Sequence, residues 1–204
     1  MLVSVAVAVV AGATINALIL ADNPVVSSLS IMPLFETSFA DLSSRRFDCL
    51  QNFYNPGNGT FNAPSSAGQS YSFTSDGHWE QALYLYENNP SNPGCVQAQL
   101  IWQHGTYTLN RNGSLTLSPY KGDGKQQLST RCGHTSNIIQ SYSQQEYMQG
   151  FDIQIGVHYG NPAYYLQLYE FDGTPKPFLW QIYNPPQMLP TSQLHLEIIG
   201  SPAD

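Results

Sequence analysis

Short runs in which apolar and polar residues alternate fill the middle of this chain of 204 residues. The strongest run is 151–157, where Phe, Ile, Ile and Val alternate with Asp, Gln and Gly. Successive side chains of a β-strand point to opposite faces of its sheet, so a period of two predicts a strand with one face buried. Residues 96–103 alternate in the same way, with Val96, Ala98, Leu100 and Trp102 on one face.

Turn residues between strand-like runs predict three antiparallel hairpins. The most aromatic one reverses at 172–177, where a glycine can adopt positive φ and two prolines cannot continue a ladder. Another reverses at Ser75-Asp76-Gly77 and the third at 110–113, which ends in Asn-Gly. The hairpins join 164–171 to 178–183, 70–74 to 78–87, and 106–109 to 114–117.

Further strands are expected at 126–129 and within 135–142, which gives about eight strands separated by turn signals. This spacing predicts an all-β fold, an antiparallel meander that closes into a single up-and-down, lipocalin-like barrel. A β-sandwich is the second choice. The expected divisions are an apolar leader at 1–21, a loop-rich lead-in at 22–68, the β domain at 69–190, and a tail or edge strand at 191–204.

The composition agrees with strands and excludes some partners. Only 10% of the residues are charged, against about 25% in ordinary soluble domains, and Tyr, Ser, Thr, Gln and Asn are abundant. These residues favour strands and turns over helices. The net charge of -7 disfavours nucleic acid, whose phosphates bind clustered cations, and no basic segment indicates an anionic membrane surface.

Residues 1–21 are apolar and carry no charge, which is typical of a secretory signal or apolar leader. The alternative is a buried strand or helix of the fold. Two glycosylation acceptor triplets, at Asn58 and Asn112, lie in glycine-containing turns and agree with the secretory pathway.

The three cysteines are an odd count, so at least one has no partner within the chain. Cys95 and Cys132 both lie in predicted loops, and we predict that they form a disulfide, which leaves Cys49 unassigned. Closing such a loop would stabilise the fold by roughly 3 to 4 kcal/mol in the chain-entropy model. No second Cys or His stands at metal-ligand spacing, so no metal site is predicted.

No catalytic residue and no cofactor are predicted. A glycoside hydrolase would need two facing carboxyl groups, but the candidate carboxylates lie mostly in turns or at strand ends. The chain lacks a Gly-x-Ser-x-Gly nucleophile elbow and a phosphate-binding glycine loop. The carboxylates considered are Asp76, Glu80, Glu87, Asp152, Glu170 and Asp172, and the scattered histidines are His78, His104, His134, His158 and His195.

Aromatic residues remain as the candidate contact groups. Tyr and Trp combine a large apolar ring with a polar atom, and a groove lined by them suits apolar segments of other proteins. The alternative is that most of them belong to the core. The candidate contacts are Tyr84, Tyr86, Trp102, Tyr107, Tyr165, Tyr169, Trp180 and Tyr183.

Several landmarks, taken in order, resemble the fungal Rot family, which is named for reversal of Tor lethality. The resemblance spans about 69–190. The family's first Trp-containing strand has no counterpart in 23–68, and its carboxy-terminal membrane anchor is not present in this chain. The landmarks are 70–73 with Asp76-Gly77, 92–95, 103–107, 112–115, 168–175 and 185–190.

The resemblance implies a glycoprotein of the endoplasmic-reticulum lumen, membrane-anchored in other members, that assists protein folding and is needed for cell-wall β-1,6-glucan. Its expected partners are unfolded or nascent secretory proteins and other folding factors. Because no nucleotide site is predicted, we expect an ATP-independent chaperone and not an enzyme. The alternatives are a lipid- or glycan-binding barrel module and, third, a wall-glucan-modifying enzyme.

Overall fold

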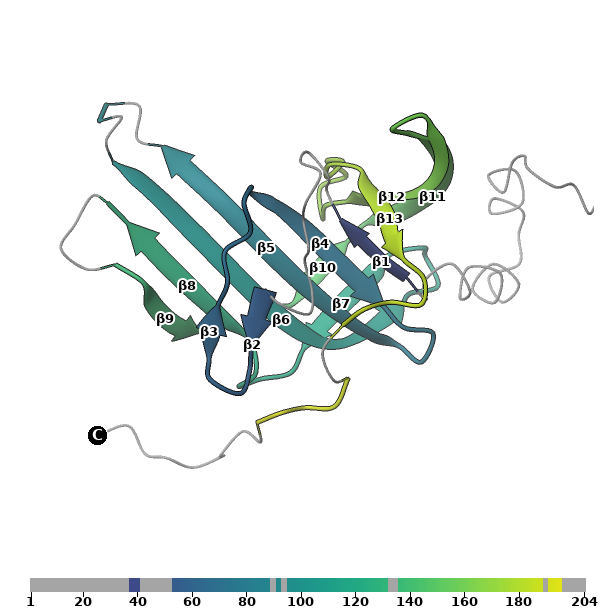
Figure 1. Ribbon diagram of the computed structural model, residues 1–204. Coiled ribbons are helices and arrows are strands. Elements are labelled where there is room, and N and C mark those ends of the chain that lie inside the picture. Colours follow the sequence, from purple (N-terminus) through teal and green to yellow (C-terminus); the bar gives the residue numbers. More distant parts are fainter. Residues whose placement is uncertain are drawn as a thin grey trace, which may run out of the picture.

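The structure, a computed structural model, describes residues 37–40, 53–88, 91–92, 95–131, 136–188 and 191–195, and these form an all-β fold (Figure 1). Both ends of the chain and the intervening gaps, including the predicted leader, lie outside the described residues. The strands are β1 Thr37–Ala40, β2 Tyr54–Asn55, β3 Thr60–Phe61, β4 Gly68–Phe73, β5 His78–Asn88, β6 Val96–Leu109, β7 Leu115–Pro119, β8 Lys125–Thr130, β9 Ile138–Ser141, β10 Glu146–Met148, β11 Gly150–His158, β12 Asn161–Tyr169 and β13 Leu179–Tyr183.

One antiparallel sheet of 11 strands contains all of these except the small hairpin β2–β3. Its main order is β10-β7-β6-β5-β4-β1-β13-β12-β11. The long strand β6 pairs with β7 near its end and with β8 along its first half, and β9 follows β8. We call the outer halves of β5 and β6, together with β8 and β9, the wing; it extends to the left in Figure 1.

The prediction of an all-β antiparallel fold is confirmed, but the closed barrel is not. β10 and β11 are the two ends of the main hydrogen-bonded order, and they are paired with β7 and β12 and not with each other. Only Gln149 separates them in the chain, so the sheet curls until its ends come together. This arrangement is compatible with a sandwich.

The main core lies on the inside of this curl, and we call this side of the sheet the inner face. Its buried residues come from strands on both halves of the sheet, so each half covers the apolar face of the other. Trp79 of β5 and Tyr107 of β6 contribute large rings. The remaining buried members are Tyr71, Phe73, Leu115, Leu117, Met148, Leu166, Leu168 and Leu179.

A second core covers the opposite, outer face. Here Ala82 and Tyr84 of β5 and Leu100 and Trp102 of β6 pack against Phe53 and Tyr54 at the start of the small hairpin. The ring of Tyr54 stacks on Trp102 with centroids 4.6 Å apart. Because both faces of β5 and β6 are covered near the centre of the sheet, these strands carry apolar residues on both faces.

All three predicted hairpins are confirmed. β12 pairs with β13 through Tyr165↔Trp180, β4 with β5 through Phe73↔Trp79, and β6 with β7 through Leu109↔Leu115.

The strand break predicted at His104-Gly105 is wrong, because β6 runs through it without interruption. A Cβ at Gly105 would lie 2.0 Å from the carbonyl oxygen of Ser118, so this glycine lets β7 approach closely and does not end the strand.

No strand was predicted before residue 69, but three lie there. β1 pairs with β4 on one side and with β13 on the other, so it joins the two halves of the sheet. β2 and β3 form the hairpin on the outer face. The partners of β1 are distant in sequence, and no local pattern identifies a strand that is completed by such partners.

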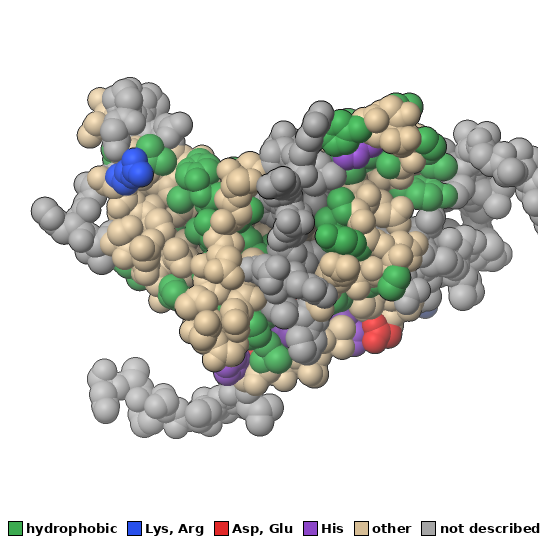
Figure 2. Space-filling view, viewed as in Figure 1, with side chains coloured by type: hydrophobic (Ala, Val, Ile, Leu, Met, Phe, Trp, Pro, Cys, Tyr) green, Lys and Arg blue, Asp and Glu red, His purple; other side chains and the backbone are tan. Residues whose placement is uncertain are grey.

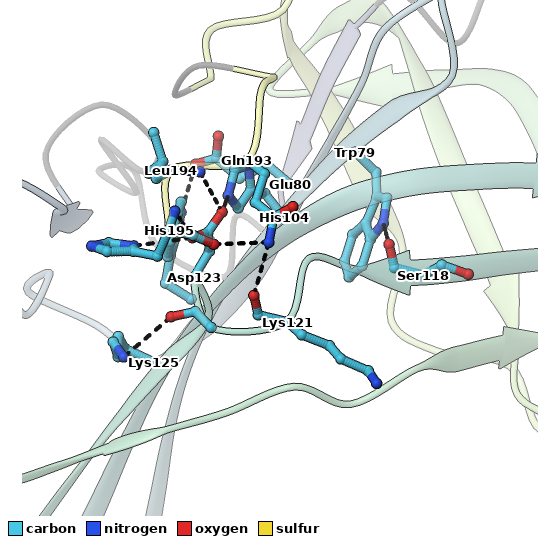
Figure 3. A network of polar contacts seen from close by, with 12 residues as sticks. Trp79, Glu80, His104, Ser118, Lys121, Asp123, Lys125, Gln193, Leu194 and His195 are labelled. Carbon is cyan, nitrogen blue, oxygen red and sulfur yellow. Dashed lines mark hydrogen bonds and ion pairs between the residues drawn. The ribbon is translucent and has the colours of Figure 1, made fainter. Parts of the chain in front are cut away.

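The carboxylate of Asp123 fastens the segment 191–195 to the outer face (Figure 3). It accepts hydrogen bonds from the backbone N of Leu194 at 2.7 Å and of His195 at 2.6 Å. It also contacts His104 Nε2 at 2.9 Å and His195 Nδ1 at 3.0 Å. Leu194 packs against the second core, so the polar contacts and the apolar contact act together.

Burial alone raises the pKa of Asp123, but the hydrogen bonds from Leu194, His104 and His195 outweigh it and hold the pKa below its ordinary value. The folded protein therefore binds the proton less tightly than the unfolded chain does. This carboxylate contributes its full stabilisation above the unfolded pKa, and the contribution is lost as the pH falls through the lower folded pKa.

Replacing Gly105 with Ala is expected to lower the free energy of unfolding by roughly 2 kcal/mol or more, because the new methyl overlaps the β7 backbone. Urea denaturation followed by tryptophan fluorescence measures it. Gly150→Ala is the matched control, since its methyl would meet only Tyr169 at an ordinary 3.9 Å. Equal stabilities of the two variants would contradict this account of Gly105.

Replacing Asp123 with Asn is expected to lower the free energy of unfolding at pH 7 by roughly 2 to 4 kcal/mol, since one amide cannot accept all of these bonds. The difference from the wild type should shrink as the pH falls below about 4, where the unfolded chain takes up the proton first and the native carboxylate, whose pKa is lower, follows. Denaturation at a series of pH values measures both effects. A difference that stays constant down to pH 2 would contradict the role given to the charge.

Candidate functional site

The inner face changes character along β5. Trp79 is fully buried in the main core, Gln81 is buried beside it, and Leu83 is half-buried. Leu85, two residues further, is 41% exposed. Alternate residues of a strand share a face, so these four residues lie on the inner face, which continues from the core onto the wing. On the wing, no other described residues cover it.

A polar network marks the boundary between the core and the wing. Glu146 of β10 accepts a hydrogen bond from the Tyr71 hydroxyl at 2.8 Å and another from Gln103 Nε2 at 3.1 Å. Gln81 Nε2 donates to the Tyr71 hydroxyl, and Gln103 Nε2 also donates to Gln81 Oε1, both at 2.8 Å. Burial raises the pKa of Glu146, although these hydrogen bonds and the charge of Lys176 lower it in part.

A pocket of about 430 Å³ opens beside this network, and we call it the mouth pocket. Glu146 and Glu170 contribute carboxyl groups to it, and Lys176 contributes an ammonium group. Lys176 forms an ion pair with Glu170 at 3.4 Å. The rest of the lining combines amide, aromatic and aliphatic side chains: Gln81, Gln145, Tyr142, Tyr147, Phe171, Leu83 and Met148.

A second depression of about 270 Å³ lies on the wing, and we call it the wing groove. Leu85 from β5, Leu128 from β8 and Ile138 from β9 are each exposed and line it. Since Leu83 of the mouth pocket and Leu85 of the groove are alternate residues of β5, the two depressions are neighbours on one face. The polar lining of the groove is Glu87, Gln97, Gln99, Ser129 and Thr130.

Several of the predicted aromatic contacts are core residues. Tyr84, Trp102 and Tyr107 are buried, and Trp102 donates from Nε1 to Glu80 at 3.0 Å. Tyr86 is 52% exposed and its hydroxyl meets that of Tyr84. None of these four rings lines either depression among the described residues.

The other predicted contacts lie on β12 and β13, away from the wing. The Trp180 ring stacks on His158 with centroids 4.4 Å apart, and Tyr165 lies against Trp180 at 5.3 Å. The Tyr169 hydroxyl donates to Asp152 at 2.8 Å, and Tyr183 pairs with Ser38 of β1. Figure 2 shows hydrophobic side chains gathered over the β11–β12 region and few charged ones on this face of the molecule.

Sequence reasoning missed the residues that shape the inner face. Glu146 belongs to no predicted strand. On the outer face, Asp123 is likewise absent from the carboxylates that the sequence singled out. The aliphatic residues Leu85, Leu128 and Ile138 were passed over in favour of aromatic ones. β8 is mostly polar, with Leu128 as its one aliphatic residue, so no apolar pattern marked its side of the groove in the sequence.

The two glycosylation triplets have the same local geometry, in exposed turns. The Asn58 side-chain oxygen accepts from the Thr60 hydroxyl at 2.6 Å, and that of Asn112 accepts from the Ser114 hydroxyl at 2.7 Å. The glycine between them adopts a positive φ in both triplets. Both Asn residues therefore stand on turns that a glycan can occupy without displacing a neighbouring strand.

Cys95 is disulfide-bonded, while Cys49 and Cys132 lie outside the described residues. Gln97 of β6 pairs with Thr130 of β8, and Arg131 N donates to the carbonyl oxygen of Val96 at 3.0 Å. The chain just before Cys132 thus runs beside the chain just after Cys95. This favours the predicted pairing with Cys132, which stays a prediction.

Within the described ranges no group of three or more His, Cys, Asp or Glu residues is arranged to hold a metal ion. Asp123 with its two histidines is a structural cluster, since its carboxylate is used in holding the 191–195 segment. Over those same residues no helix is long and apolar enough to cross a membrane.

Comparison with known proteins identifies the family. The profile of the Rot1 family, described as "Chaperone for protein-folding within the ER, fungal", matches residues 43–198. This range contains both depressions and the Asp123 cluster. No solved structure matches the chain.

Curated relatives agree. Protein rot1 of Schizosaccharomyces pombe is 41% identical over 152 residues, 74% of this chain and 65% of that protein. Protein ROT1 of Debaryomyces hansenii is 42% identical over 147 residues, 70% and 59% of the two chains. Protein ROT1 of Saccharomyces cerevisiae is 43% identical over 144 residues, 70% and 56%.

The chain thus spans between 56% and 65% of the length of these three relatives. The matching profile covers well over half of the chain, and the identities extend over most of it. The expectation from the sequence landmarks is confirmed: this chain belongs to the fungal Rot1 family of chaperones for protein folding within the endoplasmic reticulum.

Proposed function

We propose that this chain is an ATP-independent folding factor of the endoplasmic-reticulum lumen that holds exposed apolar segments of secretory proteins on the inner face of its wing. The observation that carries the proposal is the wing groove, where Leu85, Leu128 and Ile138 are exposed. They lie on the same face of the sheet as the buried main core. Exposed apolar surface of this kind is typical of a site that binds other proteins.

The surrounding chemistry suits many different clients. The groove combines aliphatic side chains with amides, hydroxyls and one carboxylate, Glu87, so it can bury apolar side chains and hydrogen-bond an extended backbone without matching one sequence. A low charge density also avoids repelling or selecting clients by net charge. On this proposal the partners are unfolded or nascent secretory proteins together with other folding factors.

The role in cell-wall β-1,6-glucan follows on this proposal from folding the proteins that make or attach the polymer, with no reaction catalysed by this chain. The family's description as chaperones supports a non-enzymatic role. Attachment to a membrane and glycosylation are features that the resemblance implies, and we retain both as predictions.

Replacing Leu85 and Leu128 together with Gln is expected to weaken client binding about tenfold, because two exposed anchors lose their apolar contact. Both residues are exposed, so the melting temperature should change little. Light scattering of a chemically denatured glycoprotein, without nucleotide, measures suppression of its aggregation.

The matched control for this double variant is Val157→Gln, because Val157 is 76% exposed but lies at the far hairpin and outside the groove. It should suppress aggregation like the wild type. Absence of suppression by the wild type would reject the proposed function. Equal losses in the control and the double variant would reject the groove as its location.

Secretion-pathway expression is expected to attach one glycan at Asn58 and one at Asn112, since both acceptors lie in exposed turns. On gel electrophoresis, each Asn→Gln variant should have an apparent mass lower than the wild type by one glycan. Endoglycosidase H should remove both glycans from the wild type. Asn62→Gln, in a nearby stretch without an acceptor triplet, is the control. An apparent mass of the wild type that endoglycosidase H does not change would contradict the prediction.

A further inference from the structure

Glu146 is a half-buried carboxylate that accepts its hydrogen bonds from neutral groups. These hydrogen bonds come from the phenol of Tyr71 and the amide of Gln103. The ion pairs found among the described residues involve Asp76, Asp123 and Glu170, and Glu146 takes part in none of them. Partial removal of a carboxylate from water is costly unless a cation compensates its charge, so this position favours a cationic binding partner.

The one cation in the mouth pocket does not fill this role. Lys176 lies 3.4 Å from Glu170 and forms its ion pair there. Its charge acts on Glu146 from a greater distance and only partly offsets the effect of burial on the pKa of that carboxyl. The pocket therefore holds two carboxyl groups and one ammonium group, an excess of negative charge.

The neutral lining also suits a cation on a long apolar stem. Tyr142, Tyr147 and Phe171 line the pocket, and aromatic faces attract cations, guanidinium above all. Leu83 and Met148 offer aliphatic contact for a stem. The volume of about 430 Å³ lies in the range of ordinary ligand sites and accommodates one side chain.

We propose that the mouth pocket binds an arginine side chain of a client segment whose neighbouring apolar residues lie in the wing groove. This proposal names a feature of the client and so rests on the proposed function. Leu83 lines the mouth pocket and Leu85, two residues further along β5, lines the wing groove. One extended client segment can therefore place neighbouring side chains in the two depressions.

Arginine fits better than lysine. A carboxylate has about four acceptor positions, and Tyr71 and Gln103 occupy two of them, which leaves positions for a planar, two-pronged donor. Guanidinium is also less strongly hydrated than ammonium and stacks on aromatic rings. A neutral sugar would hydrogen-bond the same amides but would leave the partly buried charge of Glu146 uncompensated.

The test uses short acetylated, amidated peptides with two leucines and one variable residue: arginine, citrulline or lysine. Citrulline keeps the shape of arginine and removes its charge. Binding to the full chain is measured by calorimetry, and methionine-methyl NMR reports the location, because Met148 lines the pocket whereas Met188 does not. Met148→Leu assigns the resonance.

The expected result is that the arginine peptide binds at least about tenfold more tightly than the citrulline peptide, with lysine between them. The Met148 methyl resonance should shift and that of Met188 should not. Glu146→Gln should abolish the preference for arginine, while Asp76→Asn, which removes one exposed carboxylate elsewhere, should retain it.

Equal affinities for the arginine and citrulline peptides on the wild type would overturn the proposal, and this comparison needs no variant to fold. Gentiobiose, the β-1,6-linked disaccharide of glucose, serves as the glycan probe. A change in the Met148 methyl chemical shift with gentiobiose but not with the arginine peptide would overturn the proposal in favour of a glycan site. Aggregation suppression measured on the same preparation separates the two hypotheses. If the protein suppresses aggregation but does not prefer the arginine peptide, the proposed function is retained and arginine binding in the mouth pocket is rejected.

Discussion

The register between β5 and β6 is the constraint on which the rest of the structure depends. It pairs residues 78–88 with 96–106 without a shift, so each side chain is assigned to one face over the full length of both strands. Trp79 then lies in the core of the curl, and Trp102 lies under the small hairpin. A slip of one residue would exchange the two faces and bury the network glutamines in apolar surroundings.

The same register explains how a folded domain keeps an apolar surface exposed. Both faces of β5 and β6 are covered where other strands curl around them. Where only β8 and β9 extend the sheet, the part of the chain that the structure describes leaves the inner face open. The network of Tyr71, Gln81, Gln103 and Glu146 lies at the transition. Its hydrogen bonds pair most of the polar groups at the end of the core with one another, while the Glu146 carboxylate keeps acceptor positions open towards the mouth pocket.

Local patterns predicted the parts of the fold that depend on neighbours in sequence. The alternation at 151–157 and the Asn-Gly turn before Ser114 are visible in the sequence, because strand faces and tight turns are decided within a few residues. β1, the uninterrupted β6 and the mouth pocket are not, since each depends on distant partners. Gly105 shows the difference: a glycine has the same appearance whether it ends a strand or lets another strand approach.

The central claim is that clients occupy the inner face of the wing, and Leu85 and Tyr86 allow a direct measurement. They are adjacent on β5, 41% and 52% exposed, and lie on opposite faces of the sheet. A photo-crosslinking amino acid placed at each position in turn reports which face contacts a defined denatured glycoprotein. Crosslinking from position 85 with little from position 86 is the predicted result, and equal or reversed yields would contradict it.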